Sequence, residues 1–412
     1  MSAEDSSRFS IFDFRPFTYF WFARVFGQIA LQMQTVAVGW QVYDLTSRPL
    51  DLGYVGLSQF FATVVFILLA GQAADRYDRR NVVCVSQIVV GAAMAALMVG
   101  TAGGFQTRDL ILGIVFVIGA ARAFEQPTQQ SLLPALVPPP VLSRAVAASS
   151  ASNQIATIMG PAIGGLLYAV SPTMVYAICA GLYLLAFVLM SLIRIDRPPP
   201  RKEPMTFEIV FAGIHFIRRN PIILGAITLD LFAVLFGGAT ALLPVFAKDI
   251  FHTDAWGLGL LRLSPAIGAL AMSLVLARMP MTRNAGRIMF AAVAAFGLAT
   301  MVFALSKSFA LSMVALAFLG AADLLSVVVR QTLIQLRTPD AMRGRVSAVN
   351  SLFVGTSNQL GEFESGLTAA LWGTVPAVFI GGLGTLLVVL VSLKIFPALA
   401  RVDTMEKPAE EK

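Results

Sequence analysis

Two long uncharged runs on either side of a short charged segment constrain the fold of this chain more than any other feature. Residues 52–74 and 81–107 contain no Asp, Glu, Lys or Arg. Each run is longer than the ~20 apolar residues with which a helix crosses a bilayer. The segment 75–80 between them holds two Asp and three Arg and must lie in water. The sequence therefore predicts two membrane-spanning helices joined by a tight loop, which its arginines place on the cytoplasmic side.

The composition excludes an ordinary soluble globule, because 57% of the residues are hydrophobic and only 13% are charged. The formal net charge of +7 does not indicate a nucleic-acid partner, since the basic residues form short clusters between apolar runs and not one continuous face. Cys84 and Cys179 both lie inside apolar runs, so we expect no disulfide framework, no metal site and no cofactor. Residues 1–15 lack the apolar core of a signal peptide, and the first helix is expected to be retained.

Twelve apolar segments are long enough to span a bilayer, which predicts an all-α polytopic membrane protein. The expected spans are 17–45, 50–74, 81–103, 109–136, 142–170, 172–193, 222–249, 255–279, 286–306, 309–336, 342–371 and 374–397. Lys and Arg residues between the spans gather on one side. The other side holds only Arg48, Arg108, Lys248 and Lys307. This asymmetry predicts that both termini are cytoplasmic.

The two halves of the chain resemble one another. Residues 119–170 align without a gap onto 320–371, so that Gly160 and Gly165 meet Gly361 and Gly366. Between the halves, a Pro-rich charged stretch at 196–204 precedes an amphipathic segment at 205–219, which we expect to lie on the inner leaflet. The predicted domains are a six-helix bundle at 1–194, a linker with an interfacial helix at 195–221, a second six-helix bundle at 222–397, and a cytoplasmic tail at 398–412.

The charged loop also carries a specific order of residues. Its pattern G-x-x-x-D-R-x-x-R-R comprises Gly71, Asp75, Arg76, Arg79 and Arg80. The alternative interpretation is a solvated, positively charged loop without further meaning. The pattern resembles the loop between helices 2 and 3 of the major facilitator superfamily, a family of twelve-helix transporters. From this motif and its carboxylate we expect Asp75 to dock near the start of the eleventh span, close to Arg343 or Arg345, as a conformational latch when the protein is open outward.

A second motif lies in the fifth span, where Gly160, Pro161, Gly164 and Gly165 form a Gly/Pro cluster. Such clusters in membrane helices more often serve packing. This one resembles the antiporter motif of drug exporters in the same superfamily, and the whole chain is similar to the branch with enterobactin exporters and macrolide efflux proteins. The resemblance implies export. The counterpart of the charged loop in the second half, 277–287, lacks the Gly and Asp of the motif.

Charged residues inside apolar spans are costly and require an explanation. They are Arg24, with Gln28 on the same face of the first span; Arg122 and Glu125 in the fourth; Asp230 in the seventh; Arg262 in the eighth; Asp323 and Arg330 in the tenth; and Glu362 and Glu364 in the eleventh. One alternative is a set of structural ion pairs, such as Arg122 with Glu125 one turn away. The set as a whole favours a wet central cavity. By family resemblance, the first, fourth, seventh and tenth spans line such a cavity.

The repeat suggests how the charges pair. Arg122 and Asp323 occupy equivalent positions, and Arg24 and Asp230 lie at comparable depths in the first and seventh spans. We expect a basic first half to face an acidic second half, with pairs that separate during transport. A carboxylate that loses its cation takes up a proton more readily. The expected order of proton-coupling candidates is Asp323, then Asp230, then Glu125.

The chain is thus predicted to be a secondary transporter that works by alternating access in a bacterial-type inner membrane. The resemblance implies that it exports an amphipathic small molecule, a siderophore or drug, in exchange for protons. It is expected to be a monomer and not an enzyme. An importer or symporter on the same fold is the alternative. A non-transporting sensor or scaffold and an intramembrane enzyme are more remote. The only histidines, His215 and His252, lie outside the expected spans, and no phosphate-binding GxxxxGK[ST] motif is present.

Overall fold

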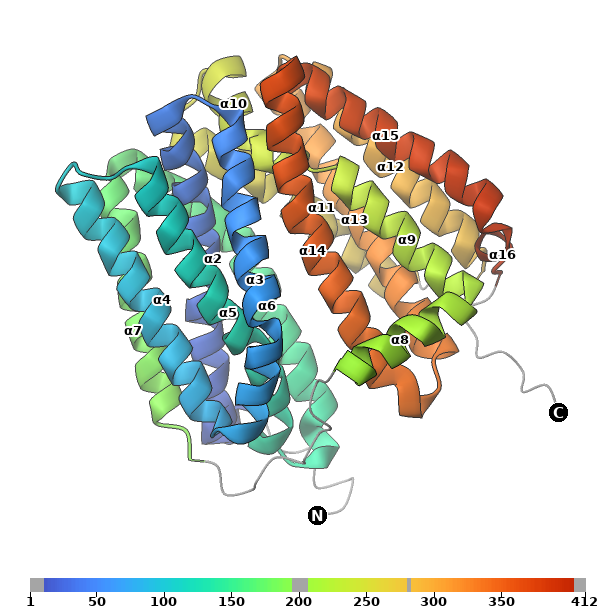
Figure 1. Cartoon of the computed structure of the whole chain (residues 1–412), viewed down its shortest axis with the longest axis horizontal. Coiled ribbons are helices and arrows are strands. Elements are labelled where there is room, and N and C mark those ends of the chain that lie inside the picture. Colours follow the sequence, from blue (N-terminus) through green and yellow to red (C-terminus); the bar gives the residue numbers. More distant parts are fainter. Residues whose placement is uncertain (1–10, 195–206, 280–282, 404–412) are drawn as a thin grey trace. The chain divides into compact units, whose positions relative to one another are not determined.

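The computed structural model describes residues 11–194, 207–279 and 283–403 and contains helices but no strand within these ranges (Figure 1). The longer helices are α2 (Arg15–Thr46), α3 (Pro49–Arg76), α4 (Arg79–Ala102), α5 (Arg108–Leu136), α6 (Leu142–Val170), α7 (Pro172–Ser191), α8 (Phe207–Arg219), α9 (Pro221–Phe236), α11 (Ala255–Arg278), α12 (Ala285–Leu305), α13 (Phe309–Arg337), α14 (Asp340–Trp372) and α15 (Thr374–Ile395). Shorter elements are η1 (Ile11–Asp13), η2 (Pro139–Val141), η3 (Ala239–Leu242), α10 (Leu243–Val245), η4 (Phe246–Ile250) and α16 (Pro397–Ala400).

Every expected span except the seventh coincides with one helix to within a few residues. Among the described residues, nine segments are long and apolar enough to cross a membrane. The remaining long helices, α2, α6 and α14, match expected spans but are less apolar. The architecture of the described residues is therefore the predicted all-α polytopic one, with helical segments at all twelve expected spans.

The seventh span differs from the continuous helix expected at 222–249. Helix α9 ends at Phe236, and the chain continues through η3, α10 and the π-helical turn η4. The break begins at Gly237 and Gly238, and glycine is among the weakest helix formers. A Cβ on Gly238 would lie 2.6 Å from the backbone oxygen of Gly361 in α14, so the break lets two backbones approach closely. The prediction of one unbroken helix was wrong at this point.

The charged segment at 71–80 is also more helical than the expected loop. Helix α3 continues to Arg76 and α4 begins at Arg79, which leaves only Tyr77 and Asp78 outside the helices. The Asp78 carboxylate accepts a hydrogen bond from the backbone N–H of Arg80 at 2.8 Å and caps α4. An N-cap carboxylate satisfies one of the unpaired N–H groups at a helix start. Asp78 is therefore the N-cap residue of α4.

The described chain forms two compact units. Unit 1 comprises 1–46, 58–205 and 254–263, and unit 2 comprises 47–57, 206–253 and 264–412. The first turns of α3 belong to unit 2 and the first turns of α11 to unit 1, so the units do not follow the sequence halves completely. The division into two six-helix bundles stays a prediction, and most of the expected linker, 195–206, lies outside the described residues.

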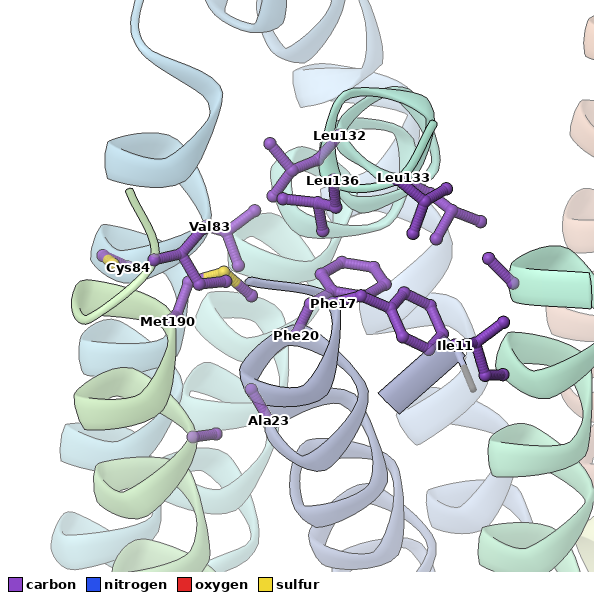
Figure 2. Close-up of a cluster of buried hydrophobic side chains, with 14 of the residues drawn as sticks. Ile11, Phe17, Phe20, Ala23, Val83, Cys84, Leu132, Leu133, Leu136 and Met190 are labelled. Atoms are coloured by element: carbon purple, nitrogen blue, oxygen red, sulfur yellow. The ribbon is translucent and has the colours of Figure 1, made fainter. Parts of the chain in front are cut away.

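An apolar cluster closes one end of unit 1 (Figure 2). Phe17 and Phe20 of α2 are fully buried there against Leu132 of α5 and Met190 of α7. Burying each of these side chains contributes roughly 1.5–3 kcal/mol when the alternative is water. The short η1 folds under the start of α2 and adds Ile11 to the same cluster. The cluster thus holds α2, α5 and α7 together at the end where Arg24 follows on α2.

Helix α8 occupies the segment in which an amphipathic helix was expected. It packs on α14 within unit 2, with Ile217 buried beside Val346 and Val349. A Cβ on Gly213 would lie 3.0 Å from the backbone oxygen of Arg345, so the two helices pack closely at this point. Phe211 stays 62% exposed. Part of the apolar face therefore contacts protein, and the placement of α8 on the inner leaflet stays a prediction.

The end of the described chain folds back onto unit 2. After α15 and α16, the Asp403 carboxylate accepts a hydrogen bond from the Asn284 backbone N–H at 3.0 Å. The backbone oxygens of Asp403 and Val402 accept from the N–H groups of Ala285 and Gly286 at 3.3 and 3.0 Å. Leu399 is fully buried and Val402 is 5% exposed, in one cluster with residues of α9, α12 and α13. We call this segment, 397–403, the C-terminal clasp.

Candidate functional site

In unit 1 the candidate site is built around the buried carboxylate of Glu125 on α5. Its Oε1 accepts a hydrogen bond from Gln129 Nε2 at 2.8 Å, one turn further along the same helix. The same oxygen accepts from Gln87 Nε2 of α4 at 3.3 Å. Glu125 and Gln129 are almost fully buried and Gln87 is completely buried. The direct partners of this carboxylate are thus two neutral amides.

Two arginines act on Glu125 through space. Arg122, one turn before it on α5, and Arg24 of α2 both interact with it electrostatically. The phenol of Tyr183 on α7 faces the same group of charges. The Nε atom of Arg24 is buried and has no hydrogen-bond partner within the described part of the chain. Unit 1 therefore gathers two cations around one carboxylate, and the predicted residues Arg24, Arg122 and Glu125 lie together.

In unit 2 the corresponding feature is a buried ion pair. Arg330 Nη1 of α13 contacts Asp230 Oδ2 of α9, and both side chains are at most 5% exposed. Asp323, two turns before Arg330 on α13, interacts electrostatically with both of them. A buried ion pair holds its partners firmly, because an uncompensated charge in an apolar interior is costly. The predicted residues Asp230, Asp323 and Arg330 therefore also form one group.

This pairing corrects the sequence-based one. Asp230 was expected to pair with Arg24, but its partner is Arg330 of the same unit. Arg24 acts instead on Glu125. A basic half and an acidic half do not describe the charges, because each unit holds both signs: Arg24 of α2 acts on Glu125 of α5, and Asp230 of α9 contacts Arg330 of α13. Sequence spacing places residues at equal depth but leaves open which neighbouring helix each side chain reaches.

Two further predicted pathway residues are Gln28 and Glu362. Gln28 is half-buried on α2, one turn beyond Arg24. Glu362 of α14 lies against the start of α3, where a Cβ on Gly56 would come within 2.6 Å of both its Cβ and its Oε2. The α3–α14 contact is made within unit 2. Glu362 thus belongs to a helix-packing contact in this structure.

The arginines of the loop motif are held by backbone oxygens of unit 1. Arg79 Nη1 donates to the Ser131 carbonyl of α5 at 3.1 Å, and Arg80 Nη1 donates to the Ile193 carbonyl beyond α7 at 3.0 Å. Arg76 is exposed and Gly71 is half-buried. The side chain of Asp75 lies outside the described set, so its docking as a latch stays a prediction. Arg79 and Arg80 themselves tie the start of α4 to its neighbours.

The Gly/Pro motif of α6 forms two packing faces. A Cβ on Gly164 would lie 2.7 Å from Met33 Cα of α2, and Gly160 faces the same helix one turn earlier. A Cβ on Gly165 would lie 2.8 Å from Gly259 Cα of α11. Pro161 adds to this second face, because its backbone oxygen lies 2.8 Å from the Cβ position of Gly259. The motif thus lets α2 and the start of α11 approach α6 on its two sides.

Within residues 11–194, 207–279 and 283–403, no group of three or more His, Cys, Asp or Glu could hold an ion. Cys84 and Cys179 are buried and not joined in a disulfide. The Cys179 thiol donates to the backbone oxygen of Ala30 at 3.4 Å.

Sequence reasoning missed Gln87. The sequence did contain a signal, because Gln87 is a large polar side chain within the uncharged, mostly apolar part of α4 between Asn81 and Ala102. Polar side chains in membrane helices commonly bond across to a neighbouring helix. Which neighbour Gln87 would reach could not be read from its own helix, since the partner Glu125 lies 38 residues further along the chain.

Comparisons with known proteins agree with this architecture. A family model described as transmembrane secretion effector matches residues 6–411. The enterobactin exporter EntS of Citrobacter koseri is 25% identical over 386 residues, which covers 92% of this chain and 91% of the relative. The EntS protein of Escherichia coli O1:K1 shows the same identity and coverage.

Solved structures share the fold at low sequence identity. A bacterial homologue of the human lysosomal transporter Spinster aligns with a TM-score of 0.74 at 11% identity, over 93% of this chain and 96% of that one. A bacterial homologue of the iron transporter ferroportin gives a TM-score of 0.71 at 15% identity, over 96% and 100% of the two chains. The chain belongs to the transmembrane secretion effector family of the major facilitator superfamily and is a multi-pass membrane transporter.

Proposed function

We propose that this transporter exports an amphipathic small molecule with an acidic group, such as a catecholate siderophore, in exchange for protons. The observation that carries the proposal is the buried charged group in each unit, Arg24 with Arg122 and Glu125 in unit 1 and Asp230 with Arg330 in unit 2. Ionisable residues inside membrane-spanning helices are costly, and their usual role is in the path of a substrate or ion.

Two features support an acidic substrate. Unit 1 places two arginines around one carboxylate, and the guanidinium group binds planar anionic groups in a bidentate manner. The buried Nε of Arg24 has no hydrogen-bond partner within the described residues and is a donor that a ligand can use. The relatives at 25% identity are enterobactin exporters, and enterobactin belongs to the class of acidic substrates proposed here.

The remaining features of the proposal follow from the sequence. The protein resides in a bacterial inner membrane as a monomer with both termini in the cytoplasm, and it works by alternating access around a central, wet path. Export is supported by the relatives and by the Gly/Pro motif of α6. Asp75 acts as the conformational latch. Import on the same fold is the competing direction.

The test uses everted membrane vesicles, in which an exporter accumulates its substrate. Labelled enterobactin and the cationic dye ethidium serve as the two probes. We expect proton-driven accumulation of enterobactin, its loss on adding a protonophore, and no comparable accumulation of ethidium. Arg24→Gln should abolish the accumulation, whereas Arg48→Gln, in an expected outer loop, should retain it. Uptake of enterobactin into intact cells that rises when the protein is produced would reverse the direction.

A further inference from the structure

Gln87 is the buried polar side chain beside Glu125 to which the proposed function gives no role. This side chain is fully buried on α4 and reaches across to α5, where its Nε2 donates to Glu125 Oε1. Its other amide atom, Oε1, is buried and has no hydrogen-bond partner in the part of the chain that the structure describes. A buried acceptor without a partner costs about 1–3 kcal/mol. The amide is therefore half satisfied while it serves an ionised Glu125.

Protonation of Glu125 would supply the missing donor. An ionised carboxylate only accepts hydrogen bonds, whereas a carboxylic acid also carries one O–H donor. The last torsion of a glutamine side chain is broad and roughly two-fold, so a turn of the amide exchanges its Nε2 and Oε1 ends. Gln87 can thus donate to the ionised form of Glu125 and accept from its protonated form without moving its backbone.

The groups that face Glu125 come from four helices. Arg24 of α2 and Arg122 of α5 act electrostatically, Tyr183 of α7 faces them, and Gln87 of α4 and Gln129 of α5 make the hydrogen bonds. The charged neighbours favour the ionised form through space. The hydrogen-bonding neighbours are amides, which can serve either form.

The acids of unit 2 lack this arrangement. Asp230 is in direct contact with Arg330, and a guanidinium has no acceptor for the O–H of a protonated acid. Asp323 shares the same cation with Asp230. Asp230 and its cation Arg330 lie in the same unit, so the expected separation of a pair between the two halves does not apply to Asp230.

We propose that Glu125 is a proton-binding site of unit 1 and that Gln87 is its positioning residue, which exchanges donor for acceptor as the proton arrives. The inference rests on the proposed proton coupling and names the group that carries the proton. No co-reactant is involved, since the only change is transfer of a proton between water and the Glu125 carboxylate. Asp323 and Asp230 then serve as fixed parts of unit 2.

The test is infrared difference spectroscopy of the purified protein in lipid nanodiscs between alkaline and acidic pH. A protonated carboxyl group gives a C=O stretching band that a carboxylate lacks. We expect a band in the wild type that shifts on 13C labelling of glutamate carboxyls but not of aspartate carboxyls. Glu125→Gln should remove it, and Glu364→Gln should leave it. Glutamate labelling separates Glu125 from Asp230 and Asp323 without a substitution, and the Glu364→Gln control separates it from Glu364.

Gln87→Leu should keep the band but move its frequency, because the hydrogen bond to the acid is lost. The matched control is Gln130→Leu, which removes an exposed amide of α5 and should change nothing. The inference is overturned if no glutamate band appears at acidic pH, if Glu125→Gln retains it, or if Gln87→Leu leaves its frequency unchanged. If vesicles accumulate enterobactin in spite of such a result, the proposed export stands and only the proton site at Glu125 is rejected. If the glutamate band appears but the vesicles do not accumulate enterobactin, the proton site stands and the proposed export is rejected.

Discussion

Replacing Asp403 by alanine should loosen the start of α12 while leaving the rest of unit 2 folded. Asn284, at the N-cap position, adopts a left-handed conformation with φ 57° and makes no capping bond with its own side chain. The cap is supplied by the Asp403 carboxylate through the Asn284 N–H. Losing an N-cap side chain costs about 1 kcal/mol. That free energy corresponds to about a fivefold change in a local opening equilibrium.

A larger perturbation removes the whole C-terminal clasp. A stop after Ile395 deletes Leu399 and Val402, whose burial contributes about 1.5–3 kcal/mol each. It also removes two backbone acceptors of α12, each with a net contribution of about 0.5–1.5 kcal/mol. The expected loss is about 4–9 kcal/mol, comparable with the whole stability of a domain. A stop after Asp403 keeps every clasp contact and is the matched control.

Hydrogen–deuterium exchange followed by mass spectrometry measures both effects. In Asp403→Ala, peptides that contain Ala285 and Gly286 should exchange about fivefold faster, whereas peptides of α4 in unit 1 should not change. The truncation after Ile395 should expose α12 and α9 together and lower the thermal midpoint of the purified protein. The reasoning is refuted if Asp403→Ala leaves the exchange at Ala285 unaltered, or if both truncations behave alike.

Three further predictions concern Asp230, Gly164 and Asp75. Asp230→Asn should destabilise unit 2 by about 3–5 kcal/mol, because Arg330 stays buried without its partner. Adding Arg330→Met should recover part of the lost thermal midpoint, and no recovery would contradict the ion pair. Gly164→Val should sharply reduce the yield of folded protein in detergent extracts, since the valine side chain would meet the backbone of α2. Gly181→Ala should not reduce it, because no other helix comes within 4 Å of that Cβ position, and equal yields would argue against the close contact. Asp75→Asn should keep expression but strongly reduce enterobactin accumulation in everted vesicles, and normal accumulation would exclude a latch.

The membrane-spanning architecture was accessible from the sequence, and the reason is physical. In a bilayer every backbone polar group must be paired within the protein, so an uncharged apolar run of sufficient length is a helix. That rule located α3, α4 and α15 to within a few residues. It failed after Phe236, where Gly237 caps the end of α9 and the backbone of α14 approaches Gly238.

The charged residues of the candidate site were likewise visible in the sequence, because a charge in an apolar run is conspicuous wherever it lies. Their partners were not visible. Asp230 finds Arg330, 100 residues further along the chain, and Glu125 finds Gln87 on a helix that carries no charge beyond its first turn. Helical periodicity determines the face on which a side chain lies but says nothing of the helix that packs there. The C-terminal clasp shows the same limit, since only the folded chain brings the Asp403 carboxylate to the N–H group of Asn284.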